Sequence, residues 1–502
     1  MKHLPATVAT QVDSDNAEAF SVIDLDQVRS FGYRMVDIIV KHLASSRERP
    51  IFPPALAAQE ASAALAFDDA PHGPAEPLEL LDRLERYLLP ASGNVLHPGI
   101  MSWVMSTPLP IPSLLDGLTS SLCLFPYTAR LTPGSIELEL TVCRWLGRMT
   151  GYADDAFGYL TSGGTMANLY GLAAARSSVV GVGVGRNGTS SGPLLTVYAS
   201  VQAHFCIERA LALMGIGSAQ LRRIPVDADF AMQAPLLREA IRRDRQMGHL
   251  PLCIVGTAGT TLTGAVDHFD ELADIAAAEG VWLHVDGAYG ALGALDPRRR
   301  FLFRGIERAN SLALDPHKWL NVPFGVGCIL VKDKAALARA FHPETASYMR
   351  GNDSGGHDHW HYGFEMARPD RATKVWLAIN LYGVDGYAAL VSRHHGFASR
   401  LYDLFVADPE FEPLHRPALS VLCFRYVGKG LGAVARDAVN REVEAALRGG
   451  LQAFVAGAEF DGHPVLRVCF VNHRTTWDDV LRAVDAVRDL GRRLSAQAGP
   501  AA

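Results

Sequence analysis

Residues 281–290 read VWLHVDGAYG, and residues 311–321 read SLALDPHKWLN. Each stretch begins with a short apolar run and continues into polar residues, which include Asp286 in the first and Lys318 in the second. Short apolar runs of this kind are typical of buried parallel strands. Because open α/β sheets bind ligands at the carboxyl ends of their strands, we expect Asp286 and Lys318 to lie near one site.

Further strands are predicted on both sides of these two. Apolar runs occupy residues 194–200 (LLTVYAS), 252–258 (LCIVGTA) and 325–331 (GVGCILV), and a helical pattern, DELADIAAAEG, fills residues 270–280. Strands that alternate with helices in this way predict an α/β fold around a mainly parallel sheet.

The N-terminal part has a different pattern. Apolar residues at helical spacing predict an amphipathic helix over residues 24–43. Residues 50–77 carry several prolines and no clear period, which predicts an extended connector. Residues 177–192 are rich in Gly and Ser and predict a surface loop.

Beyond Tyr382, longer helical patterns and two apolar strands at 420–427 and 464–471 predict a smaller α+β C-terminal domain. The expected organisation has three parts: a helical N-terminal segment at 1–110, a large domain at 111–384 and a small domain at 385–502.

Four motifs carry candidate chemistry. In TSGGTMAN (161–168), Gly163 and Gly164 precede a helical pattern, so that backbone N–H groups can face a phosphate, although such a pair is also common in ordinary turns. His204 follows a strand and can stack on a flat heteroaromatic ring, or it is simply a structural histidine. Asp286 can hold a ring nitrogen protonated, and a semi-buried Lys318 amine can form an imine.

The composition excludes several classes of protein. Lys and Arg total 47 against 53 Asp and Glu, a net charge of -6, and no long basic block occurs, so nucleic acid is not an expected partner. No apolar stretch approaches the roughly 20 residues of a membrane helix, and the N-terminus lacks the apolar core of a signal peptide. The seven scattered cysteines form no Cys-x-x-Cys pair. We therefore expect a cytoplasmic protein without a membrane partner.

Taken together, the motifs resemble the group II pyridoxal 5'-phosphate (PLP)-dependent amino acid decarboxylases, the family of aromatic L-amino acid decarboxylase and glutamate decarboxylase. HVDGAYG followed by DPHKW is highly specific for this family. The likeness runs through HPGIMSWV (97–104), TPGSIELELTVCRWLGRMTGY (132–152), RATKVWLAINLYGVDGY (371–387) and SVLCFRY (420–426). It implies PLP fold type I with a mixed seven-stranded sheet, and a homodimer in which the N-terminal segment packs on the partner and the active sites lie at the interface.

The resemblance also implies roles for single residues. Lys318 would carry PLP as a Schiff base, Asp286 would pair with the pyridine nitrogen, and His204 would stack on the ring opposite Ala288. The phosphate would be held by Gly163, Gly164, Thr260 and His317. Asp315 stands where animal members often have Asn, which alters the surroundings of the phosphate.

The implied reaction is the decarboxylation of an L-amino acid to an amine and CO2. In the family, the acid that protonates Cα is usually a tyrosine on a mobile loop, and the corresponding stretch here is residues 351–364. His357 stands at the tyrosine's position, with Tyr348 upstream and Tyr362 downstream. We expect the imidazolium of His357 to donate this proton near neutral pH.

The positions that would face the substrate form two strips: Val104, Met105 and Thr107, and Phe125, Tyr127 and Arg130. Their mixture favours an apolar or aromatic substrate. Arg130 offers an alternative, because a guanidinium can grip the carboxylate of glutamate or aspartate, but it can equally form a surface ion pair.

Three rival interpretations remain at this point. The first is a PLP-dependent aldehyde synthase on the same scaffold. The second is a catalytically silent homologue, which predicts the loss of Lys318, Asp286 or His204, although all three are present. The third is a metal site at His357, His359 and His361, which the neighbouring glycines and the family's chemistry disfavour.

Overall fold

The computed structural model describes residues 24–65, 70–71, 73–190, 192–341, 357–428, 430–450 and 453–498. The chain divides into two compact units, residues 1–97 and residues 98–502. Tyr348 and most of the loop expected to carry the catalytic acid lie outside the described residues, whereas His357 is described.

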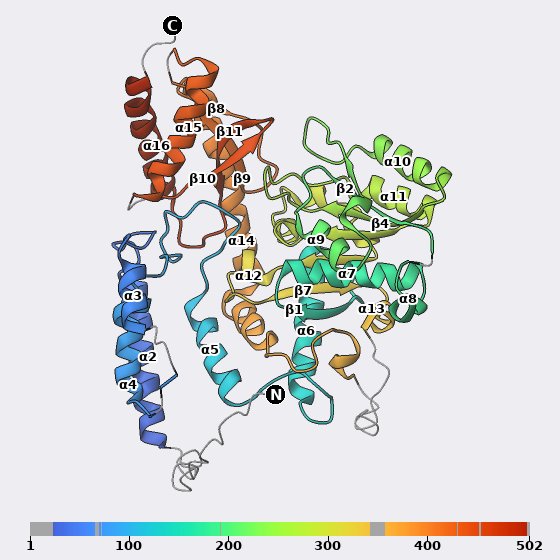
Figure 1. Ribbon diagram of the computed structural model, residues 1–502, viewed down its shortest axis with the longest axis horizontal. Helices are drawn as coiled ribbons and strands as arrows, with labels where there is room; N and C mark the ends of the chain where they lie inside the picture. Colours follow the sequence, from blue (N-terminus) through green and yellow to red (C-terminus); the bar gives the residue numbers. More distant parts are fainter. Residues whose placement is uncertain are drawn as a thin grey trace, which may run out of the picture. The chain divides into compact units, whose positions relative to one another are not determined.

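The first unit is helical (Figure 1). Helix α2 (Leu25–Ala44) confirms the predicted amphipathic helix and begins at Asp24, whose carboxylate accepts hydrogen bonds from the N–H groups of Asp26 and Gln27. Helices α3 (Ala57–Leu65) and α4 (Pro77–Arg83) follow. The prediction of an extended connector is wrong for α3, because the prolines of that stretch lie outside the helix and do not interrupt it.

A seven-stranded sheet forms the centre of the second unit. Its strands are β1 (Phe157–Thr161), β2 (Leu195–Ser200), β3 (Leu221–Ile224), β4 (Leu250–Thr257), β5 (Trp282–Asp286), β6 (Ser311–Leu314) and β7 (Gly327–Val331). The order is β1-β7-β6-β5-β4-β2-β3, and only β7 runs antiparallel to its neighbours. The six parallel strands therefore end at one edge, as the sequence predicts.

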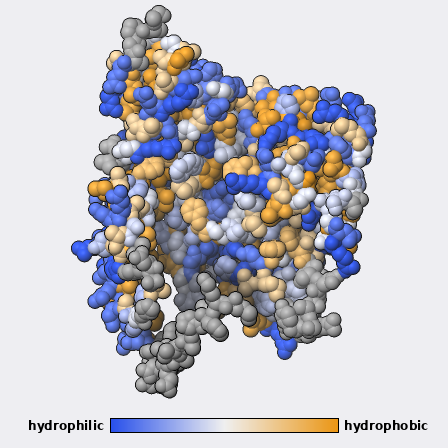
Figure 2. Space-filling view, in the orientation of Figure 1, coloured by the Kyte–Doolittle hydropathy of each residue, from blue (hydrophilic) through white to orange (hydrophobic). Residues whose placement is uncertain are grey.

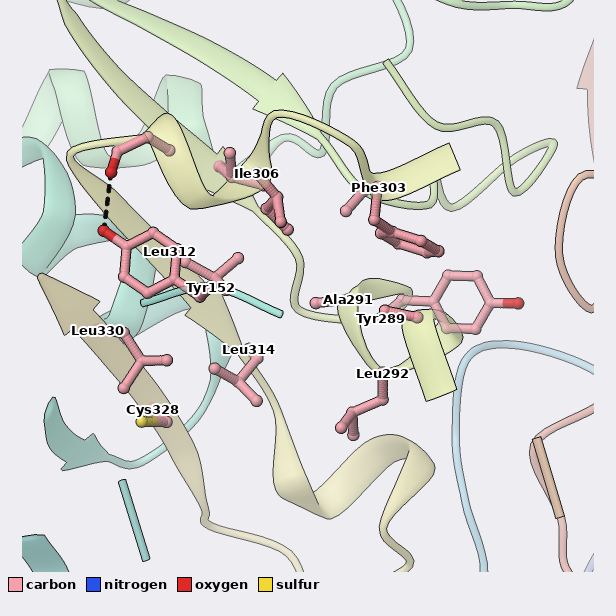
Figure 3. Packing of buried hydrophobic residues seen from close by; sticks show 14 of the residues in the cluster. Tyr152, Tyr289, Ala291, Leu292, Phe303, Ile306, Leu312, Leu314, Cys328 and Leu330 are labelled. Atoms are coloured by element: carbon pink, nitrogen blue, oxygen red, sulfur yellow. Dashed lines mark hydrogen bonds between the residues drawn. The ribbon is translucent and has the colours of Figure 1, made fainter. Parts of the chain in front are cut away.

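Helices cover both faces of this sheet, which explains why its strands are apolar on both sides. On one face, a hydrophobic core lies between the sheet and helices α7 (Gly164–Val179), α9 (Cys206–Leu213) and α13 (Lys334–Phe341). On the other face, a second hydrophobic core lies between the sheet and helices α6 (Pro133–Thr150), α10 (Ala234–Gln246) and α11 (Phe269–Glu279). Figure 3 shows part of the second core, where the Tyr152 hydroxyl donates a hydrogen bond to the Ala309 carbonyl at 2.9 Å. Short helix α8 (Gly183–Asn187) lies within the predicted surface loop.

The C-terminal part contains a second, antiparallel sheet, which includes the two predicted strands. Its strands are β8 (Phe411–Pro413), β9 (Val421–Tyr426), β10 (Ala456–Phe460) and β11 (His463–Cys469), in the order β10-β11-β9-β8. Helices α15 (Ala433–Arg448) and α16 (Trp477–Ala498) share a core with this sheet.

Helix α14 (Ala372–Ala407) is the one described helix that is long and apolar enough to span a membrane by length and composition. Core helices of globular proteins pass the same test. Gly383 interrupts the helix with non-helical dihedral angles (φ 67°, ψ 162°), and the buried imidazoles of His394 and His395 lie in its second half. Helix α14 therefore gives only weak support for a membrane span.

Candidate active site

A cavity of about 300 Å³ lies at the carboxyl edge of the seven-stranded sheet. Its wall contains eight of the nine predicted cofactor-binding residues: Gly163, Gly164, His204, Asp286, Ala288, Asp315, His317 and Lys318. These residues come from the ends of β1, β2, β5 and β6 and the turns after them. The fold thus brings together side chains that are up to 155 positions apart in the sequence.

Lys318 lies on the single helical turn α12 (Pro316–Trp319), directly after β6. Its Nζ atom is 3.2 Å from Oδ2 of Asp315. Burial alone would lower the pKa of Lys318, but the carboxylates of Asp315 and Asp286 outweigh burial, and the pKa is raised. In the free protein the amine is therefore a cation near neutral pH.

Asp286 ends β5, and its buried carboxylate accepts a hydrogen bond from the N–H group of Ala288 at 3.1 Å. A second acceptor on the cavity wall is His204, whose Nδ1 atom accepts from the N–H group of Cys206 at 3.3 Å. Because Nδ1 accepts, the proton of the neutral ring resides on Nε2. Burial lowers the pKa of His204, which keeps this imidazole uncharged near neutral pH.

The turn between β1 and α7 can approach an anion closely. Gly163 has φ 154° and ψ 176°, a conformation reserved almost entirely for glycine. A Cβ atom on Gly164 would lie 2.6 Å from Oδ2 of Asp315 and 2.9 Å from the Ala288 side chain. No side chain caps the start of α7, so its first N–H groups remain oriented toward the cavity edge.

A buried chain of hydrogen bonds fixes this helix start from behind. The amide of Asn168 donates to the Gly164 carbonyl at 2.9 Å, and its oxygen lies 2.8 Å from Nε2 of His284. Nδ1 of His284 lies 2.8 Å from the Ser311 hydroxyl. Burial lowers the pKa of His284 to about 4, so the ring is neutral and donates from Nε2 to Asn168. The network holds the first turn of α7 against β5 and β6.

Comparison with known proteins identifies the family. The model of the pyridoxal-dependent decarboxylase conserved domain matches residues 61–427, most of the chain. The chain belongs to this family. As in the family, its cofactor is PLP, and this decarboxylase is a carbon–carbon lyase of PLP fold type I.

Individual relatives extend the match beyond the domain. The decarboxylase is 30% identical to the aromatic-L-amino-acid decarboxylase of Bacillus atrophaeus over 94% of this chain and 97% of the relative. It is 29% identical to the enzyme of the same name from Rattus norvegicus, over 81% of this chain and 86% of the relative. Histidine decarboxylase of Drosophila melanogaster is 30% identical over 92% of this chain and 54% of the relative.

Solved structures agree with this assignment. Oryza sativa TDC with PLP and tryptamine superposes with a TM-score of 0.87 at 26% identity, over 94% of this chain and 99% of the other. Rhodiola rosea 4-hydroxyphenylacetaldehyde synthase superposes with a TM-score of 0.84 at 24% identity over 94% and 99%, and this likeness concerns the fold alone. Fold likeness therefore does not decide between an amine and an aldehyde product.

The residues of the cavity fit PLP. Lys318 supplies the amine for an aldehyde, and Asp286 supplies a carboxylate for a ring nitrogen. The uncapped helix start offers N–H groups to a phosphate, and a Cβ atom at Gly164 would collide with the side chains of Asp315 and Ala288 on the cavity wall. One hydroxyl on the wall, Oγ1 of Thr257, is buried without a hydrogen-bond partner, as expected of a group that faces a ligand.

The ninth predicted cofactor residue, Thr260, does not line the cavity, and its role toward the phosphate stays a prediction. The Thr260 hydroxyl is buried and bonded to Gln202 at 3.1 Å and to Thr263 at 2.8 Å. Its neighbour Thr261 lines the cavity. The sequence also missed Thr257, although its place at the end of a buried strand was a usable signal.

None of the six predicted substrate-facing residues lines this cavity. Met105 and Thr107 flank Ser106, whose hydroxyl donates a hydrogen bond to the His317 carbonyl at 2.6 Å, so this strip reaches the lysine-bearing turn. Phe125 and Tyr127 contact each other, with ring centroids 6.0 Å apart.

The strip that contains Tyr127 packs against the segment of residues 357–361. The Tyr127 carbonyl accepts a hydrogen bond from the N–H group of His359 at 3.1 Å, and Asp358 accepts one from Ala129 at 2.8 Å. Arg130 is exposed. The second strip is therefore tied to the loop region rather than to the cavity of its own chain.

His357 also lies away from the cavity of its own chain. Its ring stacks on Tyr362 with centroids 4.7 Å apart and contacts Phe157 at 5.1 Å, at the end of β1 that is opposite the cavity. Burial and the neighbouring His359 lower the pKa of His357 to about 4. The expected imidazolium near neutral pH is therefore wrong for this environment, in which the ring is neutral.

A buried ion pair holds the segment that follows. The Glu139 carboxylate on α6 accepts hydrogen bonds from Nη2 of Arg368 at 2.7 Å and from the N–H group of Leu160 at 2.8 Å. The Arg368 guanidinium also lies over the ring of Tyr159, 4.1 Å from its centroid. His359 lies 3.5 Å from Glu139. Among the described residues no cluster of three potential ligands forms a metal site.

Proposed function

We propose that the decarboxylase converts an aromatic L-amino acid to the corresponding amine and CO2. The proximity of Lys318, Asp286 and His204 in one cavity supports this proposal most strongly. When bound, PLP supplies an electron sink for the charge left at Cα after CO2 departs.

Each residue has a defined part in this proposal. Lys318 would hold the cofactor covalently through its amine. Asp286 would keep a proton at the pyridine nitrogen, and the neutral ring of His204 would pack on the cofactor without adding charge. The start of α7 would hold the phosphate.

An aromatic or apolar substrate is favoured over an acidic one for two reasons. The cavity wall formed by the described residues contains no arginine, and Arg130 is exposed. In addition, curated relatives that match most of this chain are named for aromatic amino acids.

The function is tested by screening amino acids with reconstituted enzyme and measuring CO2, amine, ammonia and peroxide together. A decarboxylase forms amine and CO2 in equal amounts from an aromatic substrate. Ammonia and peroxide in amounts equal to CO2 would instead establish an aldehyde synthase, and turnover of glutamate alone would overturn the substrate class.

We further propose that the enzyme is a homodimer, and that its N-terminal helices pack on the partner. Only Ile38 is buried along the 20 residues of α2, and α4 has no buried residue. Leu25, Val28 and Val40 of α2 are each more than half exposed. Figure 2 shows hydrophobic residues interspersed with hydrophilic ones at the surface. A helix with so much exposed apolar surface needs a cover.

A cytoplasmic location is proposed as well. All seven cysteines are free thiols, which is typical of proteins in a reducing compartment. Cells of the native host are fractionated, and the protein is detected in each fraction. The proposal expects it in the cytoplasmic fraction.

A further inference from the structure

The turn that carries Lys318 is held from outside by distant parts of the chain. Just after the lysine, the Leu320 carbonyl accepts a hydrogen bond from the Tyr387 hydroxyl of α14 at 3.0 Å. The side-chain amide of Asn321 donates one to the Val471 carbonyl, which lies beyond β11, at 3.0 Å. Asn321 is fully buried and has φ 55°, which is uncommon for a residue other than glycine. The end of the turn is therefore fixed by these contacts and not by local preference alone.

Trp319, the residue directly after Lys318, is held through its side chain. Its buried indole donates a hydrogen bond from Nε1 to Nδ1 of His394 on α14 at 3.0 Å. Nε2 of His394 lies 3.3 Å from the Asn472 carbonyl, which can only accept, so Nε2 carries the proton of the neutral ring. Both ring nitrogens are therefore engaged, and the imidazole links the lysine turn to the segment after β11.

Aromatic rings enclose the same indole. Tyr289, which lines the cavity, stacks on Trp319 with ring centroids 5.1 Å apart and an interplanar angle of 20°. The ring of His395 meets the indole edge-on, with centroids 5.3 Å apart. The Tyr289 hydroxyl is itself hydrogen-bonded to the Ser420 hydroxyl, just before β9. Because a rotation of the indole would break its hydrogen bond and both ring contacts, the orientation of Trp319 is fixed.

The link between Trp319 and His394 has no part in acid–base chemistry. Burial lowers the pKa of His394 to about 3, so the ring stays neutral near neutral pH. Its two nitrogens are occupied, and it does not line the cavity. The role left to this link is geometric. It fixes the backbone from which the flexible four-carbon side chain of Lys318 extends into the cavity.

We propose that Trp319 and His394 are positioning residues, which hold the amine of Lys318 in the geometry that it needs to join the cofactor. The inference rests on the proposed covalent role of Lys318. In that step Nζ forms a double bond to the aldehyde carbon, and the aldehyde oxygen leaves as water with two of the three ammonium protons. A displacement of about 1 Å in a positioned group can slow a reaction by about a hundredfold.

Two substitutions at His394 separate the hydrogen bond from the rest of the side chain. His394→Leu removes the acceptor and leaves the indole N–H unpaired, whereas His394→Asn keeps an acceptor oxygen on the same carbon that bears Nδ1. Excess PLP is mixed with apoprotein, and stopped-flow absorption follows the visible band. We expect the rate constant of band formation to fall about tenfold to a hundredfold in His394→Leu, and to recover to within about threefold of the native value in His394→Asn. Turnover per mole of bound PLP should follow the same order.

A matched control distinguishes positioning from stability. Tyr152→Phe removes another buried hydrogen bond, to the Ala309 carbonyl, from the same hydrophobic core as Trp319. This variant should melt at a lower temperature and keep the native rate constant. A purely structural loss reduces the amount of competent protein, and hence the amplitude of the band, but not its rate constant. Should His394→Leu fail to fold, Trp319→Phe removes the donor instead and leaves a ring against Tyr289.

The inference is overturned if the band forms in His394→Leu with the native rate constant, or if His394→Asn is as slow as His394→Leu. It is also overturned if the variants lose only the amplitude of the band, because that result marks a purely structural role. Failure of the proposed function looks different, since the native protein itself would then form no visible band with PLP.

Discussion

The cavity at the edge of the sheet and the segment of residues 357–371 are built differently. The cavity takes its residues from strand ends that one chain brings together, and hydrogen bonds behind α7 fix its glycine turn. The segment is anchored by the buried pair of Glu139 and Arg368, yet it carries His357 to the far end of β1. We propose that one chain supplies the cofactor half of the site and that a partner supplies the substrate half.

Replacing Lys318 is the strongest test of the cavity. Lys318→Ala removes the amine that binds the cofactor, and we expect turnover to fall at least about a thousandfold. The visible band of the reconstituted protein should disappear in an absorption spectrum. Lys334→Ala, at a lysine on α13, is the control and should keep both band and turnover. Retained turnover in Lys318→Ala would remove the basis of the proposed function.

Charge on α2 tests whether a partner is needed. Val28→Asp places a carboxylate on the exposed apolar side of α2, and burying it against a partner should weaken dimerisation by about 3 kcal/mol, or roughly a hundredfold. Ultracentrifugation measures the association, and activity should decline with it. Val434→Asp, on α15, is the control. A fully active monomer would contradict the proposal that a partner supplies the substrate half of the site.

The glycine turn allows a smaller and more local test. Gly164→Ala brings a Cβ atom within 2.6 Å of Asp315 and 2.9 Å of Ala288. Overpacking of this kind costs about 1–3 kcal/mol, so we expect PLP affinity to fall roughly tenfold to a hundredfold. Gly185→Ala in α8, which has open space around it, should bind PLP normally. Equal affinity of both variants would place the phosphate elsewhere.

His357 should give the smallest effect. Its pKa of about 4 leaves the ring neutral above pH 5, so His357→Phe should change the amine formation rate by less than about threefold and remove no inflection between pH 6 and pH 8. The measurement is a pH–rate profile with product analysis. A large loss of amine, or new aldehyde, would show that the ring protonates in a partner's site.

The sequence predicted the sheet well, because its strands are continuous apolar runs that lead into polar residues. Thr260 lies in the tight turn that follows β4, where Gly259 has φ 93° and the alternation of a strand no longer applies. Which hydroxyl faces the cavity therefore depends on turn geometry.

The position of His357 was not predictable for another reason. Its ring is fixed by Phe157, a residue 200 positions earlier in the chain, and motif register carries no information about such a contact. By contrast, Lys318, Asp286 and His204 follow strand ends, and strand order alone brings them to one edge.

The Glu139–Arg368 pair also sets how the enzyme should respond to acid. Burial raises the pKa of Glu139, but Arg368 and His359 outweigh burial and lower it from 4.5 to about 2. A carboxylate of this kind stabilises the fold at pH values above 4.5, and the contribution is lost as the pH falls from 4.5 toward 2. Mildly acidic surroundings should therefore leave the anchor of residues 357–371 in place, and strong acid should release this segment.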